Sequence, residues 1–333
     1  MKPIVLVGTN SFWSMREEVD ALELWNRFEL IFDKDFEISD DRAEDVQALV
    51  VGDRPIGVNI INRFPNLKTI ARAGTGYDNV DIKAAKERDI VVTRVIKLNA
   101  DAVSEFTLGL ILSLLRRIPQ LHHGMINNEW QRQQGILLSE ATVGIIGLGE
   151  IGCSLAQKLN ALGTQRVFGW NRTDRPEIDR IIASYGLEIV DIPSIMSESD
   201  VVVVAIALAP NTNQLIDSGM LSLMKKAGIL INVSRGAVVD EVALVDLLSK
   251  GLLGGVALDV FSTEPPYDDL FRKPFFNKLS GEAKSGHNVI LTPHNASMTA
   301  GNAREVALQV GRNISLVIDG HLECVEIVEY RDD

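Results

Sequence analysis

Cysteine and histidine are scarce in this chain, which limits the metal and disulfide chemistry open to it. Two cysteines and five histidines occur among 333 residues. Cys153 and Cys324 have neither the spacing of a zinc ligand set nor that of a disulfide framework, and His122, His123 and His321 have no further ligand at a suitable spacing. We therefore expect two reduced thiols and no metal site.

Clusters of positive charge and long apolar runs are also absent. Lys and Arg number 33 against 45 Asp and Glu, for a net charge of −12, and no basic cluster interrupts this excess of acid. A nucleic-acid partner is therefore not expected, because affinity for a phosphate backbone needs clustered Lys and Arg. The longest apolar run, residues 201–209, is too short to span a bilayer, and residues 4–7 are too short for a signal peptide. We expect a cytoplasmic protein without a membrane role.

The sequence does contain a regular alternation of short β-branched runs and segments of helical period. This alternation predicts an α/β fold with parallel sheets and crossover helices. In the first hundred residues we expect strands at residues 4–7, 30–32, 48–51, 69–71 and 90–93. Further along we expect strands at residues 142–146, 166–169, 201–205, 229–233, 255–258 and 289–291.

Two segments with helical spacing of apolar residues predict the helices that join these two sets of strands. Residues 102–118 are expected to form one long buried helix, and residues 301–318 a final helix that returns to the first domain. A chain of 333 residues exceeds what one hydrophobic core usually supports. We therefore expect a Rossmann domain at residues 101–295, inserted into a smaller, flavodoxin-like doubly wound domain of residues 1–100 and 296–333.

A glycine motif between two of the expected strands predicts a dinucleotide site. Gly147, Gly149 and Gly152 form the pattern G-x-G-x-x-G, with a strand before it and an amphipathic helix and a second strand after it. The first glycine would permit the tight turn, the second the approach of pyrophosphate, and the third close helix packing. The helix that starts at Glu150 and Ile151 would offer N–H groups to the diphosphate. A glycine-rich packing turn without a ligand is the alternative.

The segment after that second strand indicates which dinucleotide binds. Where an acidic residue would hydrogen-bond the ribose of NAD, the sequence has Asn171-Arg172-Thr173. Arg172 can pair with a 2′-phosphate, which a carboxylate would repel, and Asn171 and Thr173 add neutral hydrogen-bonding groups. These residues favour NADP(H). NAD(H) stays possible, since Arg172 could be a solvated loop residue and Asp174 could bind the ribose.

Three further segments carry a resemblance to a known family. They are RAGTGYDNVD at residues 72–81, NVSRGAVVDEVALVDLL at 232–248 leading into GGVALDVFSTEPP at 254–266, and TPHNASMT at 292–299. Together with the glycine motif, and in the same order, they resemble the D-isomer-specific 2-hydroxyacid dehydrogenases over roughly residues 49–314. That family includes phosphoglycerate, D-lactate, glyoxylate and hydroxypyruvate enzymes.

The resemblance implies a catalytic set of Arg235, Glu264 and His294. Reduction of a 2-keto acid needs a hydride for the carbonyl carbon and a proton for its oxygen, and an imidazole titrates near neutral pH. A neighbouring carboxylate would favour the imidazolium, and a guanidinium would hold the substrate carboxylate and polarise the keto oxygen. The plainer interpretations are an exposed turn arginine, a loop carboxylate and a strand-end histidine.

The resemblance also implies further cofactor and substrate contacts. It places Asp259 near the nicotinamide carboxamide, and assigns the substrate carboxylate to backbone N–H groups at Ala73 and Gly74. The residues that it places along the cofactor are Thr75, Ile206, Val233 and Ser234. The chain departs from the family pattern at Ile96-Lys97 and Ala207, and residues 267–287 look longer and more charged than is usual.

Three interpretations of function stay open. The first is a reductase of small 2-keto acids. The second acts on a phospho- or phosphono-2-keto acid, for which Arg54, Arg72 and Arg94 could supply a partner. The third, of another class, is an NAD(H)-sensing scaffold similar to the corepressors that share this fold. The family is commonly dimeric, and we expect a homodimer formed through the apolar helix from Ala102 and the following arm to Trp130.

Overall fold

The computed structural model describes residues 2–13, 16–20, 22–172, 186–264 and 269–328. The chain forms two compact units, one made of Met1–Asn99 with Met298–Asp333 and the other of Ala100–Ser297. Each unit is built on a parallel sheet, which confirms the expected α/β class. None of the helices in the described residues has the length and apolarity needed to cross a membrane.

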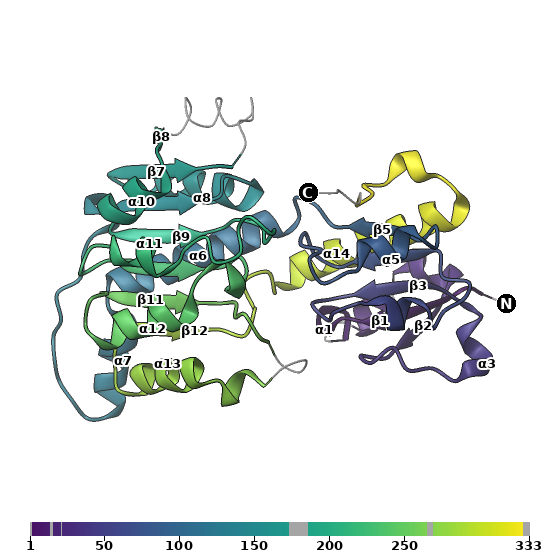
Figure 1. Cartoon of the computed structure of the whole chain (residues 1–333), viewed down its shortest axis with the longest axis horizontal. Coiled ribbons are helices and arrows are strands. Elements are labelled where there is room, and N and C mark those ends of the chain that lie inside the picture. The colour runs from purple at the N-terminus through teal and green to yellow at the C-terminus, as the bar shows by residue number, and fades with distance from the viewer. Residues whose placement is uncertain (1, 14–15, 21, 173–185, 265–268, 329–333) are drawn as a thin grey trace. The chain divides into compact units, whose positions relative to one another are not determined.

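The first unit contains a five-stranded parallel sheet in the order β2-β1-β3-β4-β5 (Figure 1). Its strands are β1 (Ile4–Gly8), β2 (Glu29–Phe32), β3 (Val46–Val51), β4 (Thr69–Arg72) and β5 (Val91–Arg94), which confirms the five strands expected there. This order, with the second strand outside the first, is that of the flavodoxin-like doubly wound fold.

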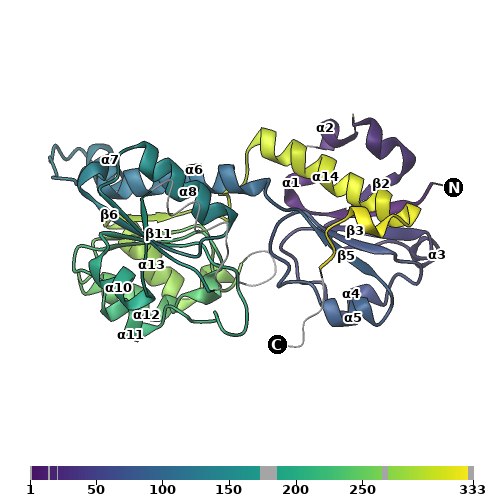
Figure 2. The same cartoon turned by 90° about the horizontal axis from the view of Figure 1, so that it is seen from above.

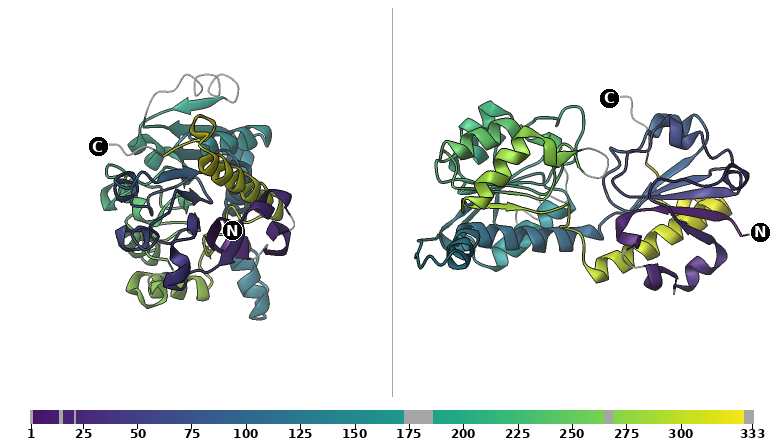
Figure 3. Two further views of the ribbon diagram at one scale, coloured as in Figure 1. Left: turned by 90° about the vertical axis from the view of Figure 1, so that its right-hand side faces the viewer. Right: turned by 90° about the horizontal axis from the view of Figure 1, so that it is seen from below.

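Helices cover both faces of this sheet (Figure 2). The helices are α1 (Asn10–Trp13), α2 (Arg16–Asp20), α3 (Asp40–Ala43), α4 (Val58–Ile61), α5 (Ile82–Lys86) and α14 (Ala300–Asp319), with 3-10 turns η1 (Glu23–Arg27) and η5 (Leu322–Cys324). On one face α14 packs with Phe12 and Trp25, and on the other Ile61 and Ala84 of α4 and α5 close the second core. Figure 3 shows the yellow α14 lying on one face of the sheet. The expected final helix is thus confirmed.

The second unit contains a seven-stranded parallel sheet in the order β12-β11-β10-β9-β6-β7-β8. Its strands are β6 (Thr142–Ile146), β7 (Arg166–Trp170), β8 (Leu187–Ile189), β9 (Val201–Val204), β10 (Ile229–Asn232), β11 (Gly255–Leu258) and β12 (Val289–Leu291). Six of these strands are confirmed and β8 is an addition. The sequence pattern does not reveal β8 because it is a three-residue edge strand in which only Leu187 is buried.

Helices sandwich this second sheet as well (Figure 2). They are α6 (Asn99–Leu115), α7 (Ile118–Ile126), α8 (Glu150–Ala161), α10 (Ile192–Glu198), α11 (Ser218–Ser222), α12 (Glu241–Ser249) and α13 (Pro274–Lys284), with turns η2 (Leu138–Glu140), η3 (Gly236–Val238) and η4 (Leu270–Arg272). Apolar residues of α6 and α8 form the core on one face, and those of α10 to α13 form it on the other. Fully buried valines at 201–204 contribute to both cores, so the central strand is apolar throughout.

One expectation about a connecting segment needs correction. The helix expected at residues 102–118 is two helices, because α6 ends at Leu115 and Arg117 adopts a left-handed backbone with φ 55°. Pro119 then lies in the first turn of α7, the part of a helix where its missing N–H is tolerated. Within the charged stretch, the described residues 269–287 contain η4 and the helix α13, whose Leu279 is buried.

Candidate functional site

The residues expected to bind a dinucleotide lie at the carboxyl edge of the seven-stranded sheet. The chain runs from β6 outward to β7 and β8, then returns to β9 and continues through β10 to β12 on the other side. The order therefore reverses between β6 and β9, and such a switch point is where open α/β sheets bind ligands. The glycine motif follows β6 and Ile206 follows β9, so the two segments flank the switch point.

The three glycines of the motif have distinct surroundings. Gly147 has a φ of 109°, a backbone conformation that side chains rarely adopt, and its N–H donates to the Trp170 carbonyl at 2.8 Å. A Cβ on Gly152 would lie 2.0 Å from the Gly147 carbonyl oxygen, so only glycine fits there. A Cβ on Gly149 would meet nothing within 4 Å. Gly149 is also the N-cap of α8, where Glu150 and Ile151 begin the helix, so open space lies before a helix N-terminus.

The residues expected to select the dinucleotide follow β7. Asn171 and the exposed Arg172 come directly after Trp170, the last residue of that strand. An Arg172 guanidinium nitrogen donates to the Asn211 side-chain oxygen at 3.0 Å. Asn211 lies in the segment after β9, and nothing in the sequence pattern singles it out, because only the fold places the two segments side by side. Thr173 and Asp174 lie outside the described residues.

The segment after β10 holds Arg235 through a buried asparagine. Asn232 ends β10 and is 1% exposed, and its side-chain oxygen accepts from the N–H and hydroxyl of Ser234 at 3.0 and 2.8 Å. Its side-chain nitrogen donates to the Arg235 carbonyl at 2.9 Å. An Arg235 guanidinium nitrogen donates to the Ser234 carbonyl at 2.8 Å. Val233 and Ser234 are buried in this turn, so Arg235 starts from a fixed backbone.

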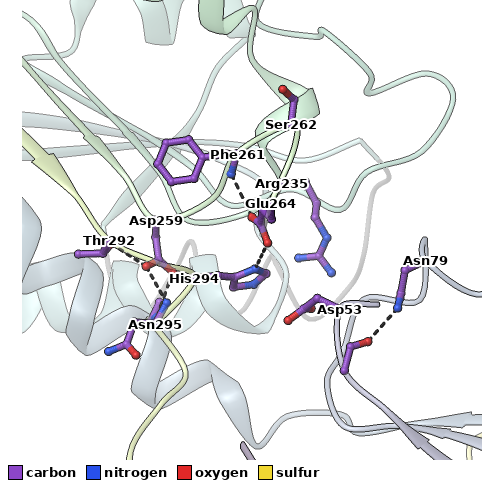
Figure 4. A network of polar contacts seen from close by, with 12 residues as sticks. Asp53, Asn79, Arg235, Asp259, Phe261, Ser262, Glu264, Thr292, His294 and Asn295 are labelled. Atoms are coloured by element: carbon purple, nitrogen blue, oxygen red, sulfur yellow. Dashed lines mark hydrogen bonds and ion pairs between the residues drawn. The ribbon is translucent and has the colours of Figure 1, made fainter. Parts of the chain in front are cut away.

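The glutamate and histidine expected to work as a pair are in contact. One Glu264 carboxylate oxygen lies 2.9 Å from His294 Nδ1, and the other accepts from the Phe261 N–H at 3.0 Å (Figure 4). Both side chains are about one-quarter exposed, at 25% and 27%. An ionised carboxylate can only accept a hydrogen bond, so with Glu264 ionised the proton of this contact is on Nδ1. The contact orients the imidazole ring.

Asp259 holds the turn that carries the histidine. It is 1% exposed, and its side chain accepts from the Thr292 hydroxyl at 2.6 Å and the Asn295 N–H at 2.8 Å (Figure 4). It also accepts from the Ala296 N–H at 3.0 Å. Its carbonyl accepts from the His294 N–H at 2.7 Å. The contact between this residue and the nicotinamide carboxamide that the resemblance implies stays a prediction. The contacts observed here position the histidine turn.

The backbone of His294 itself is unusual, with a φ of 52°. A left-handed backbone is unfavourable for a residue with a Cβ, and such residues cluster at functional sites where surrounding contacts enforce them. Here the enforcing contacts are the bonds from His294 and Asn295 to Asp259. The strained turn and the buried carboxylate therefore belong together.

Three neighbouring strands thus present the three expected catalytic residues at one edge. Arg235 follows β10, Glu264 follows β11 and His294 follows β12, and these strands are adjacent and parallel. Figure 4 shows the side chains of all three in one view. A guanidinium, a carboxylate and an imidazole at one sheet edge can bind an anion and move a proton at a neighbouring oxygen.

The remaining expected residues lie in the first unit. Ala73, Gly74 and the exposed Thr75 form the bend after β4, where the Ala73 N–H donates to the Val51 carbonyl at 2.9 Å. A Cβ on Gly74 would lie 2.8 Å from an Arg72 guanidinium nitrogen, so this bend passes directly over that guanidinium.

Comparison with known proteins identifies the family of this chain. Residues 108–296 match the family model described as "D-isomer specific 2-hydroxyacid dehydrogenase, NAD binding domain". The chain is 34% identical over 287 residues to the D-3-phosphoglycerate dehydrogenase of Methanocaldococcus jannaschii, covering 85% of this chain and 52% of that protein. It is 32% identical over 292 residues to the glyoxylate reductase of Thermococcus kodakarensis, covering 84% of this chain and 83% of that protein. The chain therefore spans about half the length of the first relative and most of the second.

A solved structure supports the same fold. The NADPH-dependent glyoxylate/hydroxypyruvate reductase of Sinorhizobium meliloti, crystallised in complex with NADP and malonate, is 27% identical to this chain. The two folds agree with a TM-score of 0.76 over 96% of this chain and 95% of that one.

The different surroundings of Gly149 and Gly152 lead to a paired prediction. Gly149→Ala has room for its Cβ, so it should lose less stability than Gly152→Ala, no more than the cost of replacing an N-cap glycine, about 1 kcal/mol. Its dinucleotide affinity should fall at least about tenfold, or about 1.4 kcal/mol. Gly152→Ala should lose about 1–3 kcal/mol of stability without any ligand, because its Cβ overlaps a backbone oxygen. Thermal unfolding and fluorescence titration with NADH and NADPH measure the two effects. Unchanged affinity in Gly149→Ala would remove this turn from the cofactor site.

Proposed function

Because this chain belongs to the D-isomer specific 2-hydroxyacid dehydrogenase family, a family of oxidoreductases that act on CH–OH groups, we propose that it interconverts a small 2-keto acid and its D-2-hydroxy acid with NAD(P)H. The observation that carries this proposal is the 2.9 Å contact between Glu264 and His294 Nδ1 at the strand edge that also bears Arg235. Under this proposal the second unit binds the dinucleotide, and the first unit is the substrate domain, in which Ala73 and Gly74 contact substrate and Thr75 contacts the cofactor.

The residues of the chain fit such a cofactor. The open space at Gly149 before the N-terminus of α8 suits a diphosphate, and the segments after β7, β9 and β10 suit the rest of the dinucleotide. The nicotinamide, when bound, supplies or accepts the hydride, and the protein orients the reactants.

The proton in this proposal travels through His294. With Nδ1 bonded to Glu264, the second ring nitrogen, Nε2, delivers a proton to the keto oxygen as the hydride reaches the carbonyl carbon. Glu264 stabilises the positive imidazolium before that transfer and holds the ring in place. Arg235 binds the substrate carboxylate and polarises the keto oxygen, and the bonds from Asn232 fix the backbone from which it extends.

Turnover measurements test this proposal. The wild-type chain should oxidise NADPH or NADH with glyoxylate, hydroxypyruvate or pyruvate, and His294→Asn should lower kcat on the order of 10²–10⁴-fold because the proton donor is gone. A chain that binds the dinucleotide but reduces none of these acids, nor 3-phosphohydroxypyruvate, would instead support the scaffold interpretation.

Small unphosphorylated acids are the substrates that the arginine contacts favour. The three arginines considered as phosphate partners each face a carboxylate of the chain, since Arg72 pairs with Asp53 at 2.5 Å and Arg94 pairs with Glu326 at 2.6 Å. Arg54 pairs with Asp35. A phosphorylated substrate would compete with these ion pairs, so we propose glyoxylate-like or hydroxypyruvate-like acids ahead of phosphorylated ones.

NADP(H) is the proposed dinucleotide, because Arg172 is exposed and its guanidinium is oriented by Asn211. Arg172→Ala should raise the KM for NADPH about 10- to 100-fold, the equivalent of one charged hydrogen bond, and leave the KM for NADH within about twofold. Asn211→Ala should show the same selectivity with a smaller effect, because it removes the orienting partner and keeps the charge. Equal effects of Arg172→Ala on both cofactors would contradict a 2′-phosphate contact.

We also propose that the chain is a homodimer through α7 and the segment after it. Large apolar side chains are exposed there, at Ile118, Met125, Ile126, Trp130 and Leu137, and Trp130 is 80% exposed. Exposed large apolar side chains concentrated in one segment commonly mark a protein interface. Light scattering should give twice the 36.6 kDa mass of one chain, and Ile126→Ser with Trp130→Ser should shift it toward one. A monomeric wild-type chain would refute the proposal.

A further inference from the structure

Glu241 is a buried carboxylate for which the proposed reaction has no use. It is 6% exposed and begins α12, next to the segment that carries Arg235. Burial raises its pKa, and the negative charges of Glu264 and Asp240 raise it further, while the bonds from Ser262 oppose that rise. Because burying a carboxylate costs free energy, a buried carboxylate usually has a hydrogen-bonding partner.

That partner is Ser262, which lies in the loop between Asp259 and Glu264. The Ser262 N–H donates to one Glu241 oxygen at 2.8 Å, and the Ser262 hydroxyl donates to the other at 2.5 Å. The Glu241 carboxylate therefore accepts hydrogen bonds from both the backbone and the side chain of one loop residue. Capping of α12 is not its task, because Asp240 accepts from the Ala243 N–H at 3.0 Å and is the N-cap.

The loop to which Glu241 is hydrogen-bonded is the same loop that carries Glu264. Glu264 closes it by accepting from the Phe261 N–H at 3.0 Å, and the other Glu264 oxygen meets His294 Nδ1 at 2.9 Å. Gly236 provides a second point of attachment, since a Cβ there would lie 1.9 Å from the Phe261 carbonyl carbon and 2.0 Å from the Ser262 nitrogen. The segment that follows Arg235 and the loop that bears Glu264 are thus packed backbone against backbone.

From these contacts we infer that Glu241 is a positioning residue, which holds Ser262 and thereby keeps the Glu264 carboxylate in register with the His294 imidazole. The inference rests on the proposed function for its kinetic consequences. Its structural content, that Glu241 controls the Glu264–His294 contact, stands on the contacts alone. A displacement of about 1 Å in such a contact can cost about 100-fold in rate.

Three variants of the full-length chain test this inference by kinetics. Glu241→Ala should lower kcat about tenfold or more and leave the KM for NADPH unchanged, because only the proton-transfer pair is displaced. Glu241→Gln should recover about half or more of wild-type kcat, since its amide can accept from the Ser262 N–H and donate to the hydroxyl. Asp240→Ala is the matched control: it removes the cap of the same helix, so it should lower the unfolding midpoint and leave kcat unchanged.

Proton NMR tests the role of Glu241 independently of enzymatic turnover. The proton on His294 Nδ1, bonded to Glu264, should give a downfield proton resonance that disappears in His294→Asn. Glu241→Ala should weaken or abolish that resonance, while Glu241→Gln and Asp240→Ala should keep it. If the wild-type chain reduced no 2-keto acid, the proposed function would fail and this comparison would still decide the role of Glu241.

Several results would overturn the inference. The first is a Glu241→Ala variant with the kcat and the resonance of the wild-type chain. The second is a loss of kcat in Glu241→Gln equal to that in Glu241→Ala. The third is a loss of kcat in Asp240→Ala as large as that in Glu241→Ala. Should Glu241→Ala fail to fold, Ser262→Ala removes the hydroxyl contact while Glu241 stays in place. That variant should then lose kcat and resonance in the same direction, and a wild-type result would refute the inference.

Discussion

The buried carboxylate of Asp259 is the constraint on which the candidate site depends. It follows β11, yet it accepts hydrogen bonds from Thr292, Asn295 and Ala296, all of which follow β12. The ends of two neighbouring strands are thereby joined by one side chain that is 1% exposed. Because a buried charge is costly unless it is well bonded, these three donors and the carboxylate stabilise one another.

The strained backbone of His294 depends on these contacts of Asp259. A non-glycine residue in the left-handed region costs on the order of 1–3 kcal/mol when it is held in a sparsely populated conformation, and it persists only where neighbouring contacts impose it. His294 meets this condition because its N–H and that of Asn295 bond to Asp259. The turn then directs Nδ1 to Glu264, whose loop is held from the other side by Glu241 through Ser262. Asn232 does the same for Arg235. Each expected catalytic side chain therefore lies in a turn or loop to which a buried polar residue bonds.

The strands and the pairing of Glu264 with His294 could be anticipated from the sequence for different reasons. The strands are predictable because buried parallel strands are continuous apolar runs, such as the valines at 201–204. The pairing was implied only by resemblance, since nothing local in a histidine before Asn295 indicates a carboxylate thirty residues away. At Arg117 the sequence pattern gave a wrong prediction. The apolar spacing continues through this residue, but the helix is interrupted there, so two helices replace the single one expected.

The sequence by itself determined the α/β class, most strands, the glycine motif and the residue types available at the ends of the strands, because these follow from local periodicity and from backbone sterics. The tertiary structure decided which of those ends are neighbours, and so brought Asn211 to Arg172 and Glu241 to Ser262. It also decided that Asp259 holds the histidine turn and that His294 takes a positive φ. The physical reason is that strand order and hydrogen bonds between distant segments depend on packing energy summed over the whole sheet, which no short window of sequence contains.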